Sequence, residues 1–277
     1  MSEPKVIRPN KGGQEHFVRT NVDVAIYGGI LAGGKLTPLN TKVLTPRGWV
    51  RNGDLKVGDE ICTPFNGVQR VAQLFPQGVK KIYKMYLLDG RIAEATEEHL
   101  WTFRTNKQRD KYINSDRSDK TRWTFTETTA QLMKRLQRGE RLYLPTNDPI
   151  EFERKDLPID PYVLGVLIGD GCMTNSQWTD NRKCLLISNN ENDVVKRFAS
   201  RLKSTRIVEY KKSYTKSVYC DDAFAIHKYL KDVGLCTYSY NKYIPKEYLF
   251  ASIEQRRELL AGLFDTDGCV DDGSFQF

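Results

Sequence analysis

The chain has 277 residues and a formal net charge of +8. It has room for two domains with separate cores, and its basic character favours a nucleic-acid partner. The six cysteines show no C-x-x-C spacing, which argues against a zinc site or a disulfide framework. There is no apolar signal region and no run long enough to span a bilayer. We therefore expect a cytoplasmic protein with no membrane partner.

Residues 1–35 end in a glycine-rich run, Val24 to Lys35. Gly29, Gly34 and Lys35 match the first part of a P-loop, although Leu36 stands where the motif needs Ser or Thr. Together with residues 9–15, this run resembles the start of a phage terminase large subunit, a DNA-packaging ATPase. The resemblance implies a nucleotide-binding segment. A glycine-rich loop that binds no phosphate is the alternative, and with no acidic strand following we expect no ATP hydrolysis by this chain alone.

Residues 36–150 change character, with short β-rich runs separated by turn residues. Asp89-Gly90 is a strong signal for a two-residue hairpin turn. The order of these runs resembles the N-terminal splicing region of an intein. The resemblance implies an all-β, horseshoe-shaped Hint fold followed by a bridge. The bridge, residues 104–150, is polar and has one expected helix near 129–138; it either contacts DNA or links the domains.

Thr96, His99 and Trp101 occupy the pattern Thr-x-x-His-x-Trp. In inteins the threonine and histidine act on the N-terminal splice junction, which here implies the bond between Lys35 and Leu36. Histidine can protonate an amide nitrogen near neutral pH. Leucine cannot supply the usual nucleophile, so the segment resembles either a class 3 intein, for which the tryptophan is characteristic, or an inactivated one. Autocatalytic splicing of this type needs no cofactor.

Residues 151–277 contain one short pattern twice, at 163–171 and at 260–268. Each copy indicates an apolar helix that ends in Asp-Gly, at Asp170 and Asp267. Asp160 before Pro161 indicates the start of the first helix, and a capping box, Ser252 with Gln255, indicates the start of the second. Small residues four apart, Gly165 with Gly169 and Gly262 with Thr266, favour close packing of the two helices.

Close packing brings two carboxylates together at helix C-termini, where negative charge is unfavourable. A bound Mg²⁺ relieves the repulsion. The repeated pattern resembles the motifs of LAGLIDADG (DOD-type) homing endonucleases, which implies that Asp170 and Asp267 bind metal and activate water at a DNA phosphodiester. Lys242, in Lys-x-Ile-Pro, matches that family's catalytic lysine. Residues 181–246 hold fourteen Lys/Arg against six Asp/Glu, which favours a basic DNA-binding sheet.

The sequence thus predicts an α+β protein with three segments: 1–35 terminase start, 36–150 Hint region with bridge, and 151–277 an α/β endonuclease domain. The expected identity is a fragment of an intein-interrupted terminase precursor, a hydrolase of double-stranded DNA that is inactive or incomplete as it stands. We expect a monomer, completed by a separate C-terminal fragment. Two alternatives stay open: a DNA-packaging ATPase fragment, and a non-catalytic DNA-binding remnant.

Overall fold

The structure is a computed structural model. It describes residues 37–64, 67–76, 78–117, 119, 122–173, 183–210, 213–271 and 274–276. Lys35, Leu36, Gly29 and Gly34 therefore lie outside the described residues. The chain divides into two compact units, Met1–Ile150 and Glu151–Phe277. Every strand pairing among the described residues is antiparallel.

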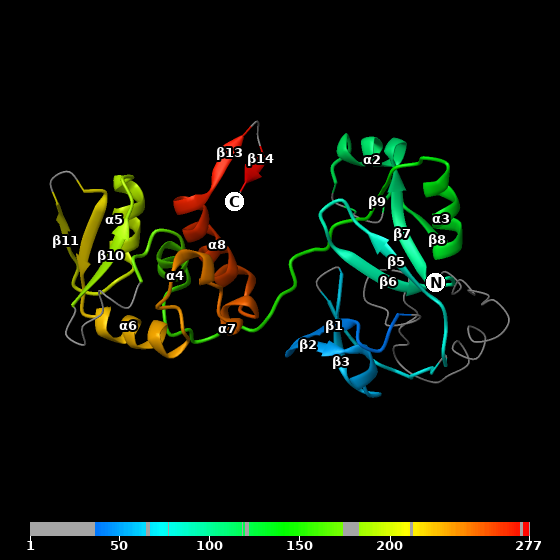
Figure 1. Cartoon of the computed structure of the whole chain (residues 1–277), viewed down its shortest axis with the longest axis horizontal. Coiled ribbons are helices and arrows are strands. Elements are labelled where there is room, and N and C mark those ends of the chain that lie inside the picture. Colours follow the sequence, from blue (N-terminus) through cyan, green and yellow to red (C-terminus); the bar gives the residue numbers. More distant parts are fainter. Residues whose placement is uncertain are drawn as a thin grey trace, which may run out of the picture. The chain divides into compact units, whose positions relative to one another are not determined.

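The described part of the first unit consists of short strands, two α-helices and one 3-10 helix (Figure 1). Its elements are β1 (Lys42–Thr45), β2 (Gly48–Arg51), η1 (Asn52–Asp54), β3 (Glu60–Thr63), β4 (Gly67–Arg70), β5 (Ile82–Tyr86), β6 (Ile92–Thr96), β7 (Leu100–Thr105), α2 (Asn106–Ile113), β8 (Phe125–Thr128), α3 (Thr129–Gln137) and β9 (Leu142–Tyr143). They form the hairpins β1-β2, β3-β4 and β5-β6 and the sheet β8-β7-β9. The strands do not establish a horseshoe fold, which stays a prediction.

One sequence prediction in this unit is confirmed in part and another in full. A turn at Asp89-Gly90 joins β5 to β6, with Gly90 at a φ of 83°, a left-handed conformation that glycine tolerates, but the loop is longer than the two residues predicted, because the Leu87 N–H donates to the Arg91 carbonyl across residues 88–90. Helix α3 begins at Thr129, and Thr128 caps it through a capping box with Gln131. Helix α2 lies in the bridge, residues 104–150, and is an addition to the one helix predicted there. It follows β7 directly, and its eight residues include none that is buried.

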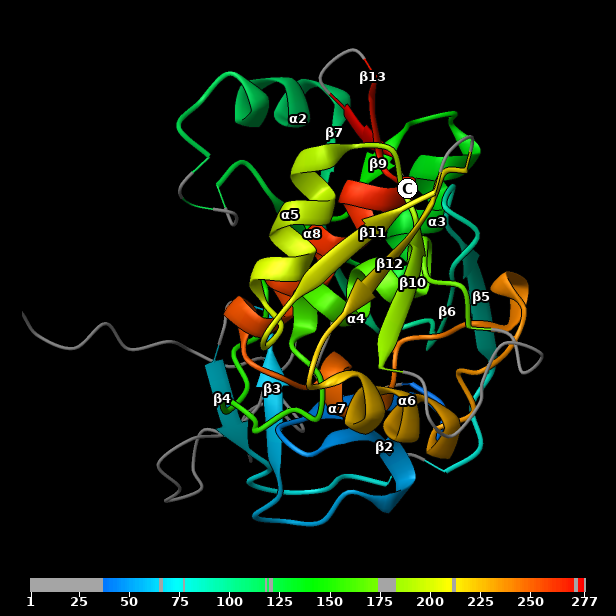
Figure 2. The same cartoon turned by 90° about the vertical axis from the view of Figure 1, so that its left-hand side faces the viewer.

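In its described part, the second unit joins helices to a three-stranded sheet and a hairpin. Its elements are α4 (Pro161–Gly169), β10 (Cys184–Ser188), α5 (Asn192–Ser200), β11 (Arg206–Glu209), β12 (Thr215–Tyr219), α6 (Ala223–Asp232), η3 (Ser239–Asn241), α7 (Lys246–Leu249), α8 (Ile253–Asp267), β13 (Cys269–Asp271) and β14 (Ser274–Gln276). The sheet has the order β10-β12-β11, and β13 pairs with β14 in a hairpin. Figure 2 looks onto the three-stranded sheet.

Helix α4 is the centre of this unit. Tyr162, Val163, Leu164, Val166 and Leu167 are all at most 2% exposed, so the helix is buried around its circumference. They belong to one hydrophobic core together with residues of the sheet and of α5, α6 and α8. Because α4 is apolar on all sides, it has to be covered by other helices and by the sheet. This explains its central position in the unit.

The predicted starts of both helices are confirmed. The carboxylate of Asp160 accepts from the backbone N–H groups of Tyr162 and Val163, and Ser252 forms the capping box with Gln255 at the start of α8. These side chains satisfy N–H groups that have no partner within the helix. Each start is therefore determined by residues that the local sequence supplies.

Candidate functional site

Helices α4 and α8 lie side by side with their backbones in contact (Figure 1). A Cβ atom added to Gly165 would lie 2.3 Å from the carbonyl oxygen of Leu259, and one added to Gly262 would lie 2.4 Å from that of Tyr162. Real side chains do not approach this closely, so glycine is required at both positions. The predicted role of the small residues as a close-packing seam is confirmed.

The same contact brings the C-terminal ends of the helices together. A Cβ on Gly169 would lie 2.0 Å from Thr266 Oγ1 and 3.0 Å from a carboxylate oxygen of Asp267. Asp170 is the next residue and caps the C-terminus of α4. Asp267 is the last residue of α8 and is exposed. The tertiary structure therefore joins the acidic ends that lie far apart in the sequence.

Asp170 is half-buried, and its carboxylate accepts a hydrogen bond from a neighbouring side chain. The amide of Asn189 donates a hydrogen bond of 2.6 Å to Oδ2 of Asp170. Burial raises the pKa of Asp170, the hydrogen bond from Asn189 lowers it, the charge of Asp267 raises it and the charge of Lys242 lowers it. The net direction is upward, as expected for a carboxylate removed from water beside a second carboxylate.

Lys242 lies at the C-terminal end of α4, next to this pair of carboxylates. Its ammonium group donates to the carbonyl oxygens of Leu167, Ile168 and Gly171 at 3.2, 2.8 and 2.9 Å. Burial lowers the pKa of Lys242, while the charges of Asp267, Cys172 and Asp170 raise it. The lysine thus neutralises the negative end of α4 and compensates part of the carboxylate charge.

The placement of Lys242 differs from the role that the sequence suggested. All three ammonium protons have backbone acceptors, so the side chain already acts as a C-terminal cap of α4. A direct contact with a phosphate would require it to leave at least one of these acceptors. We therefore expect the Lys242 ammonium to affect the site by capping α4 and by its charge near Asp170 and Asp267, and not by direct contact with a phosphate.

Asn189 is a member of the site that the sequence did not reveal. It is 8% exposed and follows β10, and its own side-chain carbonyl accepts from the N–H of Glu191. An Asn directly after a strand, here followed by Asn190, has no motif that distinguishes it from a turn residue. The sheet places the end of β10 beside the C-terminal end of α4, and this brings Asn189 next to Asp170.

The site has a donor set compatible with Mg²⁺. Among the described residues no group of three or more His, Cys, Asp or Glu side chains could hold a metal ion. Mg²⁺ is commonly bound by one or two carboxylates, with water and substrate phosphates completing its octahedron. Asp170 and Asp267 meet that smaller requirement, because they are neighbouring hard oxygen donors whose mutual repulsion a cation would relieve.

The surface of the three-stranded sheet is polar and less basic than predicted. Cross-strand pairing places Leu185, Ile187 and Val218 on the face directed to the core. The opposite face carries a mixture of hydroxyl, apolar and basic side chains, of which Cys184 and Ser217 are buried: Cys184, Leu186, Ser188, Arg206, Val208, Thr215, Ser217 and Tyr219. Arg206 lies over the ring of Tyr219, 4.4 Å from its centroid.

Lys216, by contrast, points to the core side of β12 and is 5% exposed. Its ammonium pairs with Glu209 at 3.3 Å and donates to the Asn192 side chain. Arg197 and Arg201 form ion pairs with Glu258 of α8. These three basic residues of the 181–246 segment therefore form ion pairs within the chain. A positive side chain can bind a carboxylate of the protein as well as a DNA phosphate, so the count of basic residues overstated the charge that is available for DNA.

In the first unit, Thr96, His99 and Trp101 lie close together at the junction of β6 and β7. Trp101 is 6% exposed and donates to Thr129 Oγ1 at 2.9 Å, and the rings of His99 and Trp101 meet edge to face at 5.1 Å. The hydroxyl of Thr96 is buried and has no hydrogen-bond partner among the described residues. His99 and Trp101 also line a cavity of about 600 Å³. Their role in chemistry stays a prediction.

No family model matches this chain. It is similar to the replicative DNA helicase DnaB of Mycobacterium intracellulare, with 29% identity over 252 residues. The match covers 87% of this chain and 38% of the helicase. This comparison contradicts the identity suggested by the sequence motifs: an intein with a LAGLIDADG homing endonuclease, set in a phage terminase. The relative is named a helicase and neither an intein nor a terminase. None of the described helices is long and apolar enough to cross a membrane.

Proposed function

We propose that residues 151–277 form a DNA-binding unit in which Asp170 and Asp267 hold a Mg²⁺ ion against a backbone phosphate. The observation that carries this proposal is the joining of the two acidic helix ends by the glycine seam. Two carboxylates at adjacent helix C-termini are unfavourable without a cation, and Lys242 compensates for part of their charge. A divalent ion supplies the remainder.

Two observations support DNA as the molecule that supplies the phosphate: the positive charge of the chain and its similarity to a DNA helicase. The chain has a net charge of +8, and the outer face of the β10-β12-β11 sheet offers hydroxyl groups, an aromatic ring and Arg206. Side chains of these kinds contact phosphates and base edges. The similar helicase is, by its name, an enzyme of DNA replication. A DNA-binding unit is consistent with part of such a protein.

The residues around the ion have separate tasks in this proposal. A bound Mg²⁺ would polarise a phosphate oxygen as a Lewis acid. Asp170 and Asp267 fix the position of the positive charge, and the amide of Asn189 orients the Asp170 carboxylate. Lys242 keeps the end of α4 intact beside the phosphate.

A metal-binding assay tests the proposal directly. Mn²⁺, which substitutes for Mg²⁺ at oxygen sites, is titrated into the full chain with and without a DNA duplex, and bound Mn²⁺ is followed by water-proton relaxation. We expect binding that DNA strengthens, and loss of at least about 10-fold in affinity for Asp170→Asn or Asp267→Asn. Asp232→Asn, an exposed carboxylate at the end of α6, is the matched control. Equal Mn²⁺ binding by all four proteins would refute the site.

An ATP-dependent activity is the second candidate. Its support is the helicase relative and the P-loop-like residues Gly29, Gly34 and Lys35, which lie outside the described residues. The two candidates separate in one experiment on the full chain. Release of phosphate from ATP that Lys35→Ala abolishes and Asp170→Asn leaves intact supports the nucleotide site. No phosphate release by the unmodified chain, together with Mn²⁺ binding that Asp170→Asn weakens and Lys35→Ala leaves intact, supports the paired carboxylates.

A further inference from the structure

A shallow depression in the first unit is lined by cationic and aromatic side chains. Its volume is about 550 Å³, and it lies between α2 and the segment that precedes β8. The lining consists of three cations, one carboxylate, two small polar side chains and one indole: Lys107, Lys111, Arg122, Asp110, Asn114, Ser115 and Trp123. The site proposed above lies in the other unit and uses none of these residues.

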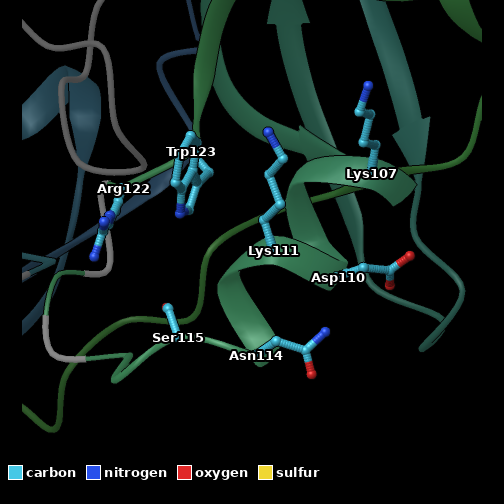
Figure 3. Close-up of a pocket in the computed structure, with 7 residues that line it drawn as sticks. All are labelled: Lys107, Asp110, Lys111, Asn114, Ser115, Arg122 and Trp123. Atoms are coloured by element: carbon cyan, nitrogen blue, oxygen red, sulfur yellow. The ribbon is translucent and has the colours of Figure 1, made fainter.

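Charge in the depression is strongly one-sided. Lys107 and Lys111, one helical turn apart, extend to the same side of α2, and Asp110 points in a different direction (Figure 3). Asp110 is also paired with Arg109 at 3.7 Å, which reduces its effect. Lys107, Lys111 and Arg122 are all exposed. The depression therefore presents a cluster of available positive charge.

Trp123 is an exposed aromatic platform within this charge. The residue is 40% exposed, and Lys111 Nζ lies 4.7 Å and the Arg122 guanidinium 5.3 Å from the centroid of its ring. Trp123 belongs to none of the hydrophobic clusters that the described residues form. Its φ of 62° is left-handed, a conformation that bulky residues rarely adopt. Core packing does not account for a tryptophan here.

A buried arginine holds the platform in place. Arg104 of β7 is 5% exposed, and its guanidinium donates twice to the carbonyl oxygen of Arg122, at 3.0 and 3.2 Å. The same guanidinium lies 3.8 Å from the ring centroid of Tyr112 in α2. These contacts tie the segment before Trp123 to both β7 and α2. The backbone that carries Arg122 and Trp123 is therefore held beside α2 before any ligand binds.

We propose that this depression binds single-stranded nucleic acid, with one unpaired base stacked on Trp123 and the flanking phosphates paired with Lys107, Lys111 and Arg122. An exposed indole surrounded by cations matches a nucleotide, which joins an aromatic face to an anion. A duplex keeps its base faces within its own stack, so an unpaired strand fits better. The inference extends beyond the proposed function, since it adds a second site with a different form of nucleic acid.

The test measures binding of a fluorescein-labelled dT12 oligonucleotide to the full chain by anisotropy. Stacking on an aromatic residue is worth about 1–3 kcal/mol per base, so Trp123→Gly should weaken binding about 10-fold. Glycine tolerates a φ of 62°, so this variant relieves backbone strain and should remain folded. Trp123→Phe keeps an aromatic face and should retain most of the affinity. Trp49→Ala, at a residue that is 57% exposed in β2, is the control.

Salt dependence tests the phosphate contacts. Lys111→Gln should weaken binding and reduce the slope of log affinity against log salt by about 0.7, the value for one phosphate of a single strand. Lys134→Gln, an exposed lysine on α3, should change neither quantity. Equal affinities for the unmodified chain and Trp123→Gly would overturn the proposal. So would binding of dTMP as tight as that of dT12, since it would indicate a mononucleotide site.

Location is settled by cross-linking. An oligonucleotide that carries 5-iodouracil is irradiated on the full chain, and the modified peptide is identified by mass spectrometry. Modification of the peptide that contains Trp123 supports the inference. Modification confined to peptides of residues 183–246 would overturn it, and would leave the DNA-binding unit proposed for residues 151–277 standing.

Discussion

The ammonium of Lys242 lies 2.8 Å from the carbonyl oxygen of Ile168, in the last turn of a helix 74 residues earlier in the chain. The same ammonium also reaches the carbonyls of Leu167 and Gly171. It therefore satisfies acceptors that have no partner within the helix and opposes the negative end of the helix dipole. This contact explains how the fold accommodates an aspartate at that end.

Replacement of Lys242 by methionine should destabilise the second unit. The variant leaves carbonyl oxygens at the end of α4 without donors and the two carboxylates without their cation, at a cost of about 2–3 kcal/mol. Hydrogen exchange of the α4 amides measures this loss in the unit itself. Lys246→Met, at an exposed lysine of α7, is the matched control and should have little effect. Equal exchange rates in the two variants would show that the cap is dispensable.

A methyl group at Gly165 should separate the paired helices. Because a Cβ would lie 2.3 Å from the carbonyl oxygen of Leu259, Gly165→Ala forces the backbones apart. Overpacking of this kind costs about 3 kcal/mol, and the separation should also weaken Mn²⁺ binding at Asp170 and Asp267. Urea denaturation and Mn²⁺ titration measure the two effects. Leu260→Ala, on α8 with its side chain 47% exposed, should leave both unchanged; a stable Gly165→Ala with normal Mn²⁺ affinity contradicts the seam.

The pKa of Asp170 predicts how stability changes with pH. Burial and Asp267 raise this pKa above its ordinary value of 3.8, so the folded protein retains a proton that the unfolded chain has lost. Its contribution to stability is therefore complete below about pH 4 and disappears as pH rises through the raised pKa. Asp170→Asn should remove this dependence, since the new side-chain carbonyl still accepts from Asn189. Thermal unfolding of the metal-free protein between pH 4 and 8 measures it.

Asp232→Asn provides the comparison, because that carboxylate is exposed. The pH profile of this control should match that of the unmodified chain. If Asp170→Asn also follows the same profile, the carboxylate of Asp170 does not titrate abnormally. Mn²⁺ affinity should fall on acidification through the same raised pKa, because the ion requires the ionised carboxylate.

The hydrogen bond of Trp101 is expected to stabilise the first unit. Trp101→Phe removes the indole N–H that donates to Thr129, whose hydroxyl is fully buried. A buried acceptor left without its donor costs about 1–3 kcal/mol. Hydrogen exchange in β7 and α3 measures this loss. Trp49→Phe is the control, and a loss of the same size in both variants would indicate that ring volume, not the hydrogen bond, is responsible.

Sequence alone determined the local features of this protein. The helix starts at Asp160 and Ser252, the hairpin turn at Gly90 and the helix at Thr129 each depend on residues within a few positions. Capping and turn formation are short-range interactions, so the sequence pattern is sufficient to predict them. The small residues of the helix seam were also evident, because helical periodicity places Gly165 and Gly169 on one face.

Tertiary structure decided what those features do. Asn189 meets Asp170, Lys242 caps α4, and Lys216, Arg197 and Arg201 enter ion pairs that a count of charges had assigned to DNA. The platform around Trp123 depends on Arg104, which lies on a different element. A charged side chain can bind solvent, DNA or another part of the chain, and the identity of its partner depends on which distant segments the fold brings within a few ångströms.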